Sequence, residues 1–130
     1  MVQICLGNEE GLKEFKDRMR SIAQSEHMTL VDGSSYTKKD LEMIGALRQA
    51  GPIIHIEVER EDTLGLTATN LGLPGYQIVI GFSEDPNPTE ARAFAKRVVD
   101  LLKTQWQVET VPSGKGALPL KSCGTPQDKH

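Results

Sequence analysis

The sequence predicts an α/β (α+β) two-layer sandwich, with a mixed sheet of about five to six strands and three helices. Apolar residues spaced three to four apart mark the helices, and shorter runs with a period of two mark the strands. The stretch from Gly51 to Phe82 holds three expected strands and the densest glycine pattern. A chain of 130 residues is long enough for one core. We therefore expect a single domain over 1–111, followed by a flexible or surface-wrapping tail over 112–130.

Six segments have the composition and alternation of strands: Val2–Leu6, Met28–Val31, Ile53–Glu59, Thr63–Thr69, Tyr76–Phe82 and Gln105–Val111. The first two flank a helical segment, which indicates a βαβ unit, right-handed if its strands are parallel. Ile53–Glu59 alternates cleanly between apolar and polar residues, which favours a sheet that is partly open on one face. The helices then cover the other face, or divide between both. Tyr76–Phe82 is apolar on both faces, so we expect it at the centre.

Three segments have helical periodicity: Glu9–Gln24, Thr37–Gln49 and Asn87–Thr104. Asn8 and Asn87 are placed to cap the first and third. Thr37 is the expected N-cap of the second, with Asp40 in the capping-box position. This second helix is expected to bury three apolar side chains, those of Leu41, Ile44 and Leu47.

The composition excludes several classes of protein. Apolar content of 38% is too high for a disordered chain, and a net charge of −3 without a basic block argues against nucleic acid as the main partner. Binding of nucleic acid through the basic tail (Lys115, Lys121, Lys129) is the weakest of three functional hypotheses. No segment approaches the roughly 20 apolar residues of a membrane span, and no signal peptide is visible. We therefore expect a cytoplasmic protein with no membrane partner.

The two cysteines, Cys5 and Cys123, show no zinc-site spacing. In a cytoplasmic protein they are expected to be reduced thiols. The alternative is a disulfide that clips the tail to the first strand.

The polar face of the predicted hairpin formed by Ile53–Glu59 and Thr63–Thr69 is the candidate site. Side chains at alternate strand positions project to one side, so the face gathers the candidate binding residues His55, Glu57, Glu59, Thr63 and Thr67, together with Thr69. A histidine beside carboxylates suits a general base or, with Asp32 or Asp62, a divalent metal. The same residue types also suit the wet face of a sheet. We assign no catalytic residue, no metal and no cofactor.

Two further segments contain residues that occur in nucleotide-binding or nucleophilic motifs. The loop Thr67–Gly75 matches neither a P-loop nor a dinucleotide fingerprint, and is interpreted as a connection in which Pro74 and Gly75 make the turn. The run from Asp32 to Ser35 offers serines, but no Gly-x-Ser-x-Gly elbow is present.

The segment Ala46–Lys103 resembles a family of small bacterial domains of unknown function. These domains have a strand with an early histidine, a threonine-bearing strand, a Gly-x-Pro turn, an apolar strand and a helix. The matching positions are His55, Ile56, Val58, Thr67, Gly72, Leu73, Pro74, Ile78, Val79, Gly81 and the helix Ala91–Leu102. The family's Thr-x-Gly-Leu and its acidic residue after the proline are replaced here by Thr67-Ala68-Thr69-Asn70 and Gly75. The resemblance implies no known activity.

These observations predict a small non-catalytic bacterial protein that acts by binding another protein, in an accessory or immunity-type role. A homodimer joined through the sheet or a sheet edge is one form of this hypothesis. The alternative is a small enzyme, or a ligand- or metal-binding domain, that uses the sheet face carrying His55 and Glu57.

Overall fold

The computed structural model describes residues 1–47, 51–61, 63–73, 75–83, 87–111 and 123. Within them the chain forms six strands and three helices: β1 (Val2–Cys5), α1 (Glu9–Ser25), β2 (Thr29–Asp32), α2 (Ser34–Met43), β3 (His55–Arg60), β4 (Leu64–Thr69), β5 (Gln77–Phe82), α3 (Pro88–Leu102) and β6 (Val108–Thr110). The predicted α+β architecture is confirmed.

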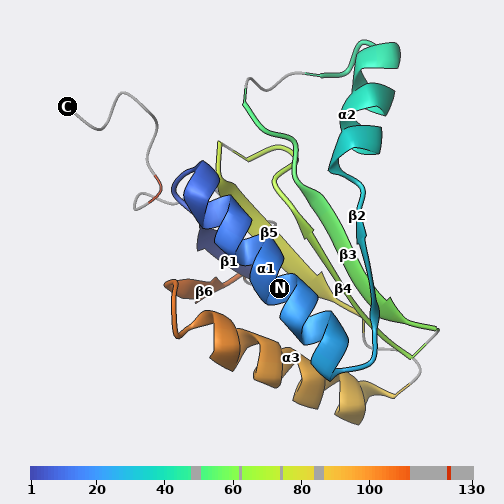
Figure 1. The fold of residues 1–130 in the computed structure, drawn as a ribbon, viewed down its shortest axis with the longest axis vertical. Helices are drawn as coiled ribbons and strands as arrows, with labels where there is room; N and C mark the ends of the chain where they lie inside the picture. The colour runs from blue at the N-terminus through green and yellow to red at the C-terminus, as the bar shows by residue number, and fades with distance from the viewer. Residues whose placement is uncertain (48–50, 62, 74, 84–86, 112–122, 124–130) are drawn as a thin grey trace.

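The six strands form one sheet in the order β2-β3-β4-β5-β1-β6, and every neighbouring pair is antiparallel. The sheet is therefore antiparallel where a mixed one was expected. β1 and β2 do run in the same direction, but three strands separate them, so the βαβ connection made by α1 spans most of the sheet (Figure 1). β5 holds one of the two middle positions, as its apolar faces predict.

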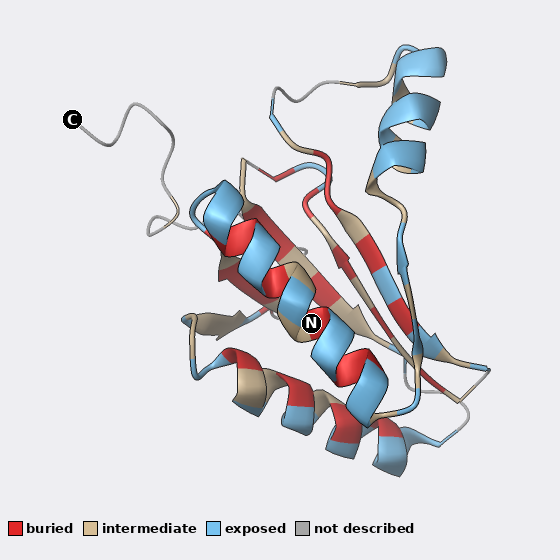
Figure 2. Ribbon diagram, in the orientation of Figure 1, coloured by how far each residue is buried: buried red, intermediate tan, exposed pale blue. Residues whose placement is uncertain are grey.

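Two helices, α1 and α3, cover one face of the sheet (Figure 1). Asn8 caps α1 by accepting a hydrogen bond from the Gly11 N–H at 2.8 Å, and Asn87 caps α3 by accepting from Glu90 at 3.1 Å. Both caps were predicted. Each helix buries a single stripe, which is red in Figure 2, against the apolar sides of the strands. The largest fully buried side chains of this core include Phe15, Met19, Phe94, Ile56, Ile78 and Ile80.

The second helix differs from its prediction in position and packing. It begins at Ser34, after Gly33, and ends at Met43, so Thr37 lies inside it and is not its N-cap. None of its residues is buried. Of the three apolar side chains expected inside, Leu41 and Leu47 are half-buried and Ile44 is exposed. Periodicity identified the helix correctly, but α2 contacts the sheet only near its start, where Ser34 meets His55, and no layer formed by the described residues covers it (Figure 2).

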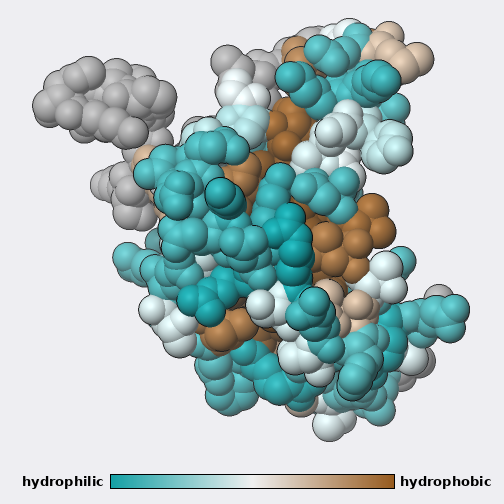
Figure 3. Space-filling view, viewed as in Figure 1, coloured by the Kyte–Doolittle hydropathy of each residue, from teal (hydrophilic) through white to brown (hydrophobic). Residues whose placement is uncertain are grey.

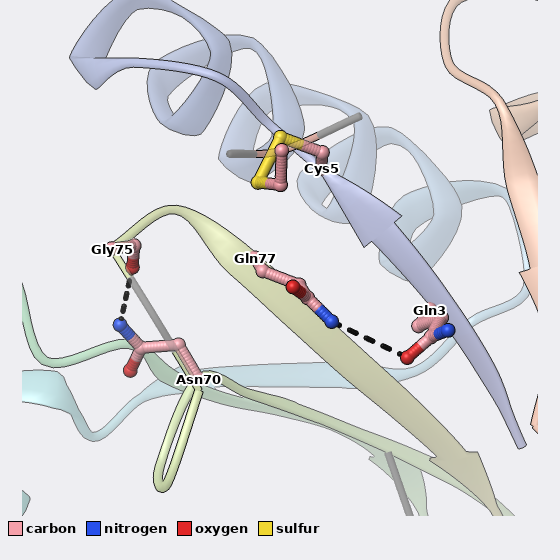
Figure 4. Close-up of a disulfide and its surroundings, with 6 residues drawn as sticks. Gln3, Cys5, Asn70, Gly75 and Gln77 are labelled. Atoms are coloured by element: carbon pink, nitrogen blue, oxygen red, sulfur yellow. Dashed lines mark hydrogen bonds between the residues drawn. A yellow bond between two sulfur atoms is a disulfide. The ribbon is translucent and has the colours of Figure 1, made fainter. Parts of the chain in front are cut away.

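Cys5 and Cys123 form a disulfide across 118 positions of sequence (Figure 4). The expectation of two reduced thiols is therefore wrong, and the alternative, a clip between β1 and the C-terminal segment, is correct. Spacing could not decide the matter, because the two sulfur atoms meet only in the folded sheet. The rest of the predicted tail, residues 112–122 and 124–130 with its three lysines, lies outside the described residues.

Candidate functional site

The face of the sheet opposite α1 and α3 carries the candidate residues. Glu57 pairs across the strands with Thr67, and His55 pairs with Thr69. Because directly paired residues of an antiparallel ladder project to the same side, His55, Glu57, Glu59 and Thr67 share this face, as predicted. Thr63 lies before β4 in the turn, where its hydroxyl donates to the Arg60 carbonyl at 3.0 Å. It is not part of the ladder.

A groove of about 800 Å³ joins this face to α3, since its lining includes residues of the open face and residues of that helix. Its walls come from three central strands, from the N-terminus and from the first half of α3. The lining residues are Met1, Glu57, Val58, Glu59, Gly65, Leu66, Thr67, Thr69, Val79, Gly81, Phe82, Ser83, Ala91, Arg92 and Ala95. The groove therefore takes in Glu57, Glu59 and Thr67, but neither His55 nor Thr63.

Two glycines make room for the groove in the middle of the sheet. Gly65 stands opposite Glu59, and Gly81 stands opposite Thr67. A side chain at either position would project from the open face, so their absence lowers the surface between the flanking residues. A glycine inside a strand often marks a site where another chain or ligand approaches closely. That signal was present in the sequence, whereas the contribution of Arg92 depends on the tertiary position of α3.

His55 lies at the edge of this region and forms a loose pair with Glu57. Its Nε2 is 3.4 Å from the Glu57 carboxylate, and its side chain is 26% exposed. The other ring nitrogen, Nδ1, is buried and has no hydrogen-bond partner among the described residues. The imidazole Cδ2 lies beside Gly33, 3.5 Å from the point that a Cβ would occupy there. The ring thus packs beside Gly33, just before α2, and is not part of the groove lining.

Asp32 and Ser34 are committed to structural contacts. The Ser34 hydroxyl donates to Asp32 at 2.6 Å and accepts from the His55 backbone N–H at 3.0 Å. Lys16 forms an ion pair with the other Asp32 oxygen at 2.9 Å. Burial alone would raise the pKa of Asp32, but hydrogen bonds from Ser34 and Lys16 outweigh it and hold the pKa below its ordinary value. Among the described residues the Ser34 hydroxyl contacts the Asp32 carboxylate and the His55 N–H, and these contacts hold the turn between β2 and α2 together.

Asp32 is not placed to join His55 and Glu57 in a metal site. Asp32 pairs with Ile56 in the ladder and therefore projects to the helix-covered face, away from Glu57. Among the described residues no group of three or more His, Cys, Asp or Glu side chains is placed to hold a metal. Asp62, the other suggested ligand, lies outside the described residues.

The Thr67–Gly75 loop is organised by Asn70, whose role the sequence did not reveal. Its side chain is fully buried. The amide nitrogen donates to the carbonyls of Pro52 and Gly75, and the amide oxygen accepts from the Ile54 N–H, each at 2.8 Å. Figure 4 shows the bond to Gly75. These contacts support the interpretation of the loop as a structural connection. Pro74, half of the predicted turn, lies outside the described residues.

A second buried polar contact crosses the open face next to the disulfide. Gln77 on β5 donates to Gln3 on β1 at 3.3 Å, and both side chains are buried (Figure 4). Their burial shows that the end of the open face near Cys5 is closed, so the accessible part of the face lies toward the groove.

Comparison of the chain with protein-family models, curated proteins and solved structures finds no match. None of the helices in the described part of the chain is long and apolar enough to cross a membrane.

Proposed function

We propose that this chain is a non-catalytic binding domain that holds a segment of another protein in the open-face groove. The observation that carries the proposal is the groove itself. Gly65 and Gly81 line it without side chains, and the carboxylates of Glu57 and Glu59 also line it. Its volume falls within the range of functional protein pockets, roughly 300–1,000 Å³. An accessory or immunity-type role in a bacterium is the context that fits such a protein.

The charged residues of the groove favour a basic partner segment. Glu57 and Glu59 line it, and Arg92 is the one basic side chain among the described lining residues. Glu59 takes part in none of the ion pairs of the described residues, and Glu57 meets only His55 at 3.4 Å. A lysine or arginine placed between two such carboxylates gains charge-assisted hydrogen bonds that the free protein does not make. We therefore expect a partner segment that carries at least one basic side chain.

Selection of a displayed random-peptide library on the immobilised protein tests this proposal. Enriched peptides should be basic and should lose affinity for a variant with Glu57→Lys and Glu59→Lys, because like charges then face each other across the interface. Glu109→Lys is the matched control, since it also reverses a charge on the sheet, and Glu109 is a half-buried strand residue that lies outside the groove lining. Failure to enrich any peptide, or equal binding to the double variant and wild type, would contradict the proposal.

The alternative, a ligand- or metal-binding domain that uses His55 and Glu57, draws support from one observation. The Nδ1 of His55, which has no partner in the described part of the chain, and the nearby carboxylate leave this residue with unused hydrogen-bonding or ligating capacity. Calorimetric titration with Zn²⁺ tests it, with His55→Ala as the comparison. Heat that disappears in His55→Ala would support the alternative, and its persistence would place the metal elsewhere.

A further inference from the structure

The helix α2 leaves large apolar side chains in solvent. Three of the six large hydrophobic residues that are exposed in the described part of the chain belong to α2 or its C-cap: Tyr36 is 74% exposed, Met43 82% and Ile44 75%. The helix projects from one corner of the sheet, and its surface is exposed along its length (Figures 1 and 2). Hydrophobic surface also lies between α1 and α2, where β2 runs (Figure 3).

Such a helix needs a partner surface. It spans 10 residues, and an isolated helix shorter than roughly 12–15 residues is marginal in water. Most helices of globular proteins are stabilised by packing of an apolar stripe, yet none of the residues of α2 is buried. An uncovered apolar stripe on a short helix therefore indicates an interaction surface.

The order of residues on this stripe identifies the partner. Tyr36 and Met43 are seven residues apart, so they lie on the same side of α2, two turns from each other. Lys39 and Asp40 lie between them on that side, and neither takes part in an ion pair of the described residues. The stripe reads apolar, basic, acidic, apolar. In an antiparallel pair of such helices, each apolar side chain would face an apolar one, and each basic side chain would face an acidic one.

We propose that α2 pairs antiparallel with α2 of a second copy of this chain. A two-fold axis between Lys39 and Asp40 places each Lys39 opposite the partner subunit's Asp40. The same axis places each Tyr36 opposite the partner subunit's Met43, a contact between a ring and a thioether that is favourable in proteins. The interface is isologous, since both subunits contribute the same patch.

This dimer is independent of the peptide groove, because no residue of α2 lines the groove. It would present two grooves in one assembly, and failure of either proposal leaves the other standing. Two helices of this length bury less than the roughly 1,200 Å² typical of stable complexes. We therefore expect a weak dimer that forms with rising protein concentration.

Sedimentation velocity of the full chain, from about 10 µM to about 1 mM, tests the pairing. Wild type should shift from monomer to dimer across this range. Lys39→Asp and Asp40→Lys should each weaken dimerisation at least about tenfold, because each places like charges opposite each other twice. An equimolar mixture of the two variants should dimerise again, since a basic helix then faces an acidic one.

Lys38→Asp is the matched control, because Lys38 lies on the other side of α2 and should leave dimerisation unchanged. Tyr36→Ser tests the apolar contact and should also weaken the dimer. Circular dichroism checks that each variant is folded. A wild type that stays monomeric at about 1 mM, single variants that dimerise as wild type does, or a mixture that fails to dimerise would each overturn the proposal.

Discussion

Glu26 and Arg97 join the end of α1 to α3 through two hydrogen bonds, in which Nε and Nη2 of the guanidinium each donate to a carboxylate oxygen at 2.8 Å. Arg60 adds to this junction, because its Nη2 donates to the Glu26 carbonyl at 2.7 Å and its Nη1 lies 3.2 Å from the Glu90 carboxylate. Charged groups from α1, β3 and α3 thus fix the two covering helices to each other and to the sheet.

Removal of the Glu26 charge should destabilise the domain modestly. Glu26→Gln keeps the side-chain volume but loses the bidentate ion pair, so we expect the free energy of unfolding to fall by about 1 kcal/mol. Arg97 is 51% exposed, and solvent screening keeps the cost small. Urea denaturation at pH 7 measures it. Lys96→Gln, which removes an exposed ion pair with Asp100 on the same helix, should change stability less.

The same ion pair predicts a loss of stability in acid. Hydrogen bonds from Arg97 hold the pKa of Glu26 below its ordinary value of 4.5, although burial opposes them. A lowered carboxyl pKa contributes stability that is complete above the pKa of the unfolded chain and disappears as pH falls through the folded pKa. The free energy of unfolding should therefore decline below about pH 4.5. In Glu26→Gln this decline should be shallower, and an unchanged slope would contradict the assignment.

Asn70→Ala should be among the most destabilising single substitutions. It leaves the Ile54 N–H and the Pro52 and Gly75 carbonyls without the partners they have at 2.8 Å. Unmet hydrogen bonds of buried groups cost about 1–3 kcal/mol each, so we expect a total loss of about 3 kcal/mol. Thermal denaturation followed by circular dichroism measures it. Leu71→Ser, at a neighbouring exposed position, should have little effect. A melting temperature of Asn70→Ala equal to that of wild type would contradict the proposed role of Asn70.

Local signals in the sequence predicted the elements of the fold well. The caps Asn8 and Asn87 and the stripes of α1 and α3 depend on residues a few positions apart, so a single segment contains the information. The strand order cannot be predicted from a single segment, because β1 lies between β5 and β6 only after the whole chain has folded. The burial of α2 was mispredicted for the same reason. Its apolar positions are real, but no layer formed by the described part of the chain lies over them.

The candidate site was predicted in part. Strand alternation placed Glu57, Glu59 and Thr67 on one face, since neighbours two apart point the same way. It also placed Thr63 there, although that residue turns back to the Arg60 carbonyl. Arg92 and Met1 reach the groove from distant parts of the chain, and no local pattern could have grouped them with Glu57.

Reduction of the Cys5–Cys123 disulfide should lower stability strongly. A cross-link that closes a loop of more than 100 residues restricts the unfolded chain and contributes about 4–5 kcal/mol. We expect a lower melting temperature in dithiothreitol, and no response in a variant with Cys5→Ser and Cys123→Ser. A wild-type melting temperature that dithiothreitol does not change would contradict the prediction.

The disulfide also bears on the cytoplasmic location expected from the sequence. Disulfides form and persist in oxidising compartments, whereas the cytosol keeps most thiols reduced. Alkylation of free thiols in intact cells, followed by mass spectrometry of both cysteines, measures the redox state directly. Alkylated cysteines would agree with a cytoplasmic protein, and a protected pair would indicate an oxidising compartment.

Filling the groove should separate binding from stability. A Cβ at Gly81 would lie 3.9 Å from the Met1 side chain, an ordinary contact, and the backbone there is not in the left-handed region. Gly81→Val should therefore leave the free energy of unfolding unchanged or raise it by up to about 1 kcal/mol, because valine favours strands. Its branched side chain would occupy the floor of the groove, so affinity for the tightest library-selected basic peptide should fall at least about tenfold in fluorescence-polarisation titrations. Thr29→Val places the same side chain on the open face outside the groove lining and should bind as wild type does. Equal affinity of the two variants would show that the peptide does not occupy the groove, even if the domain binds it.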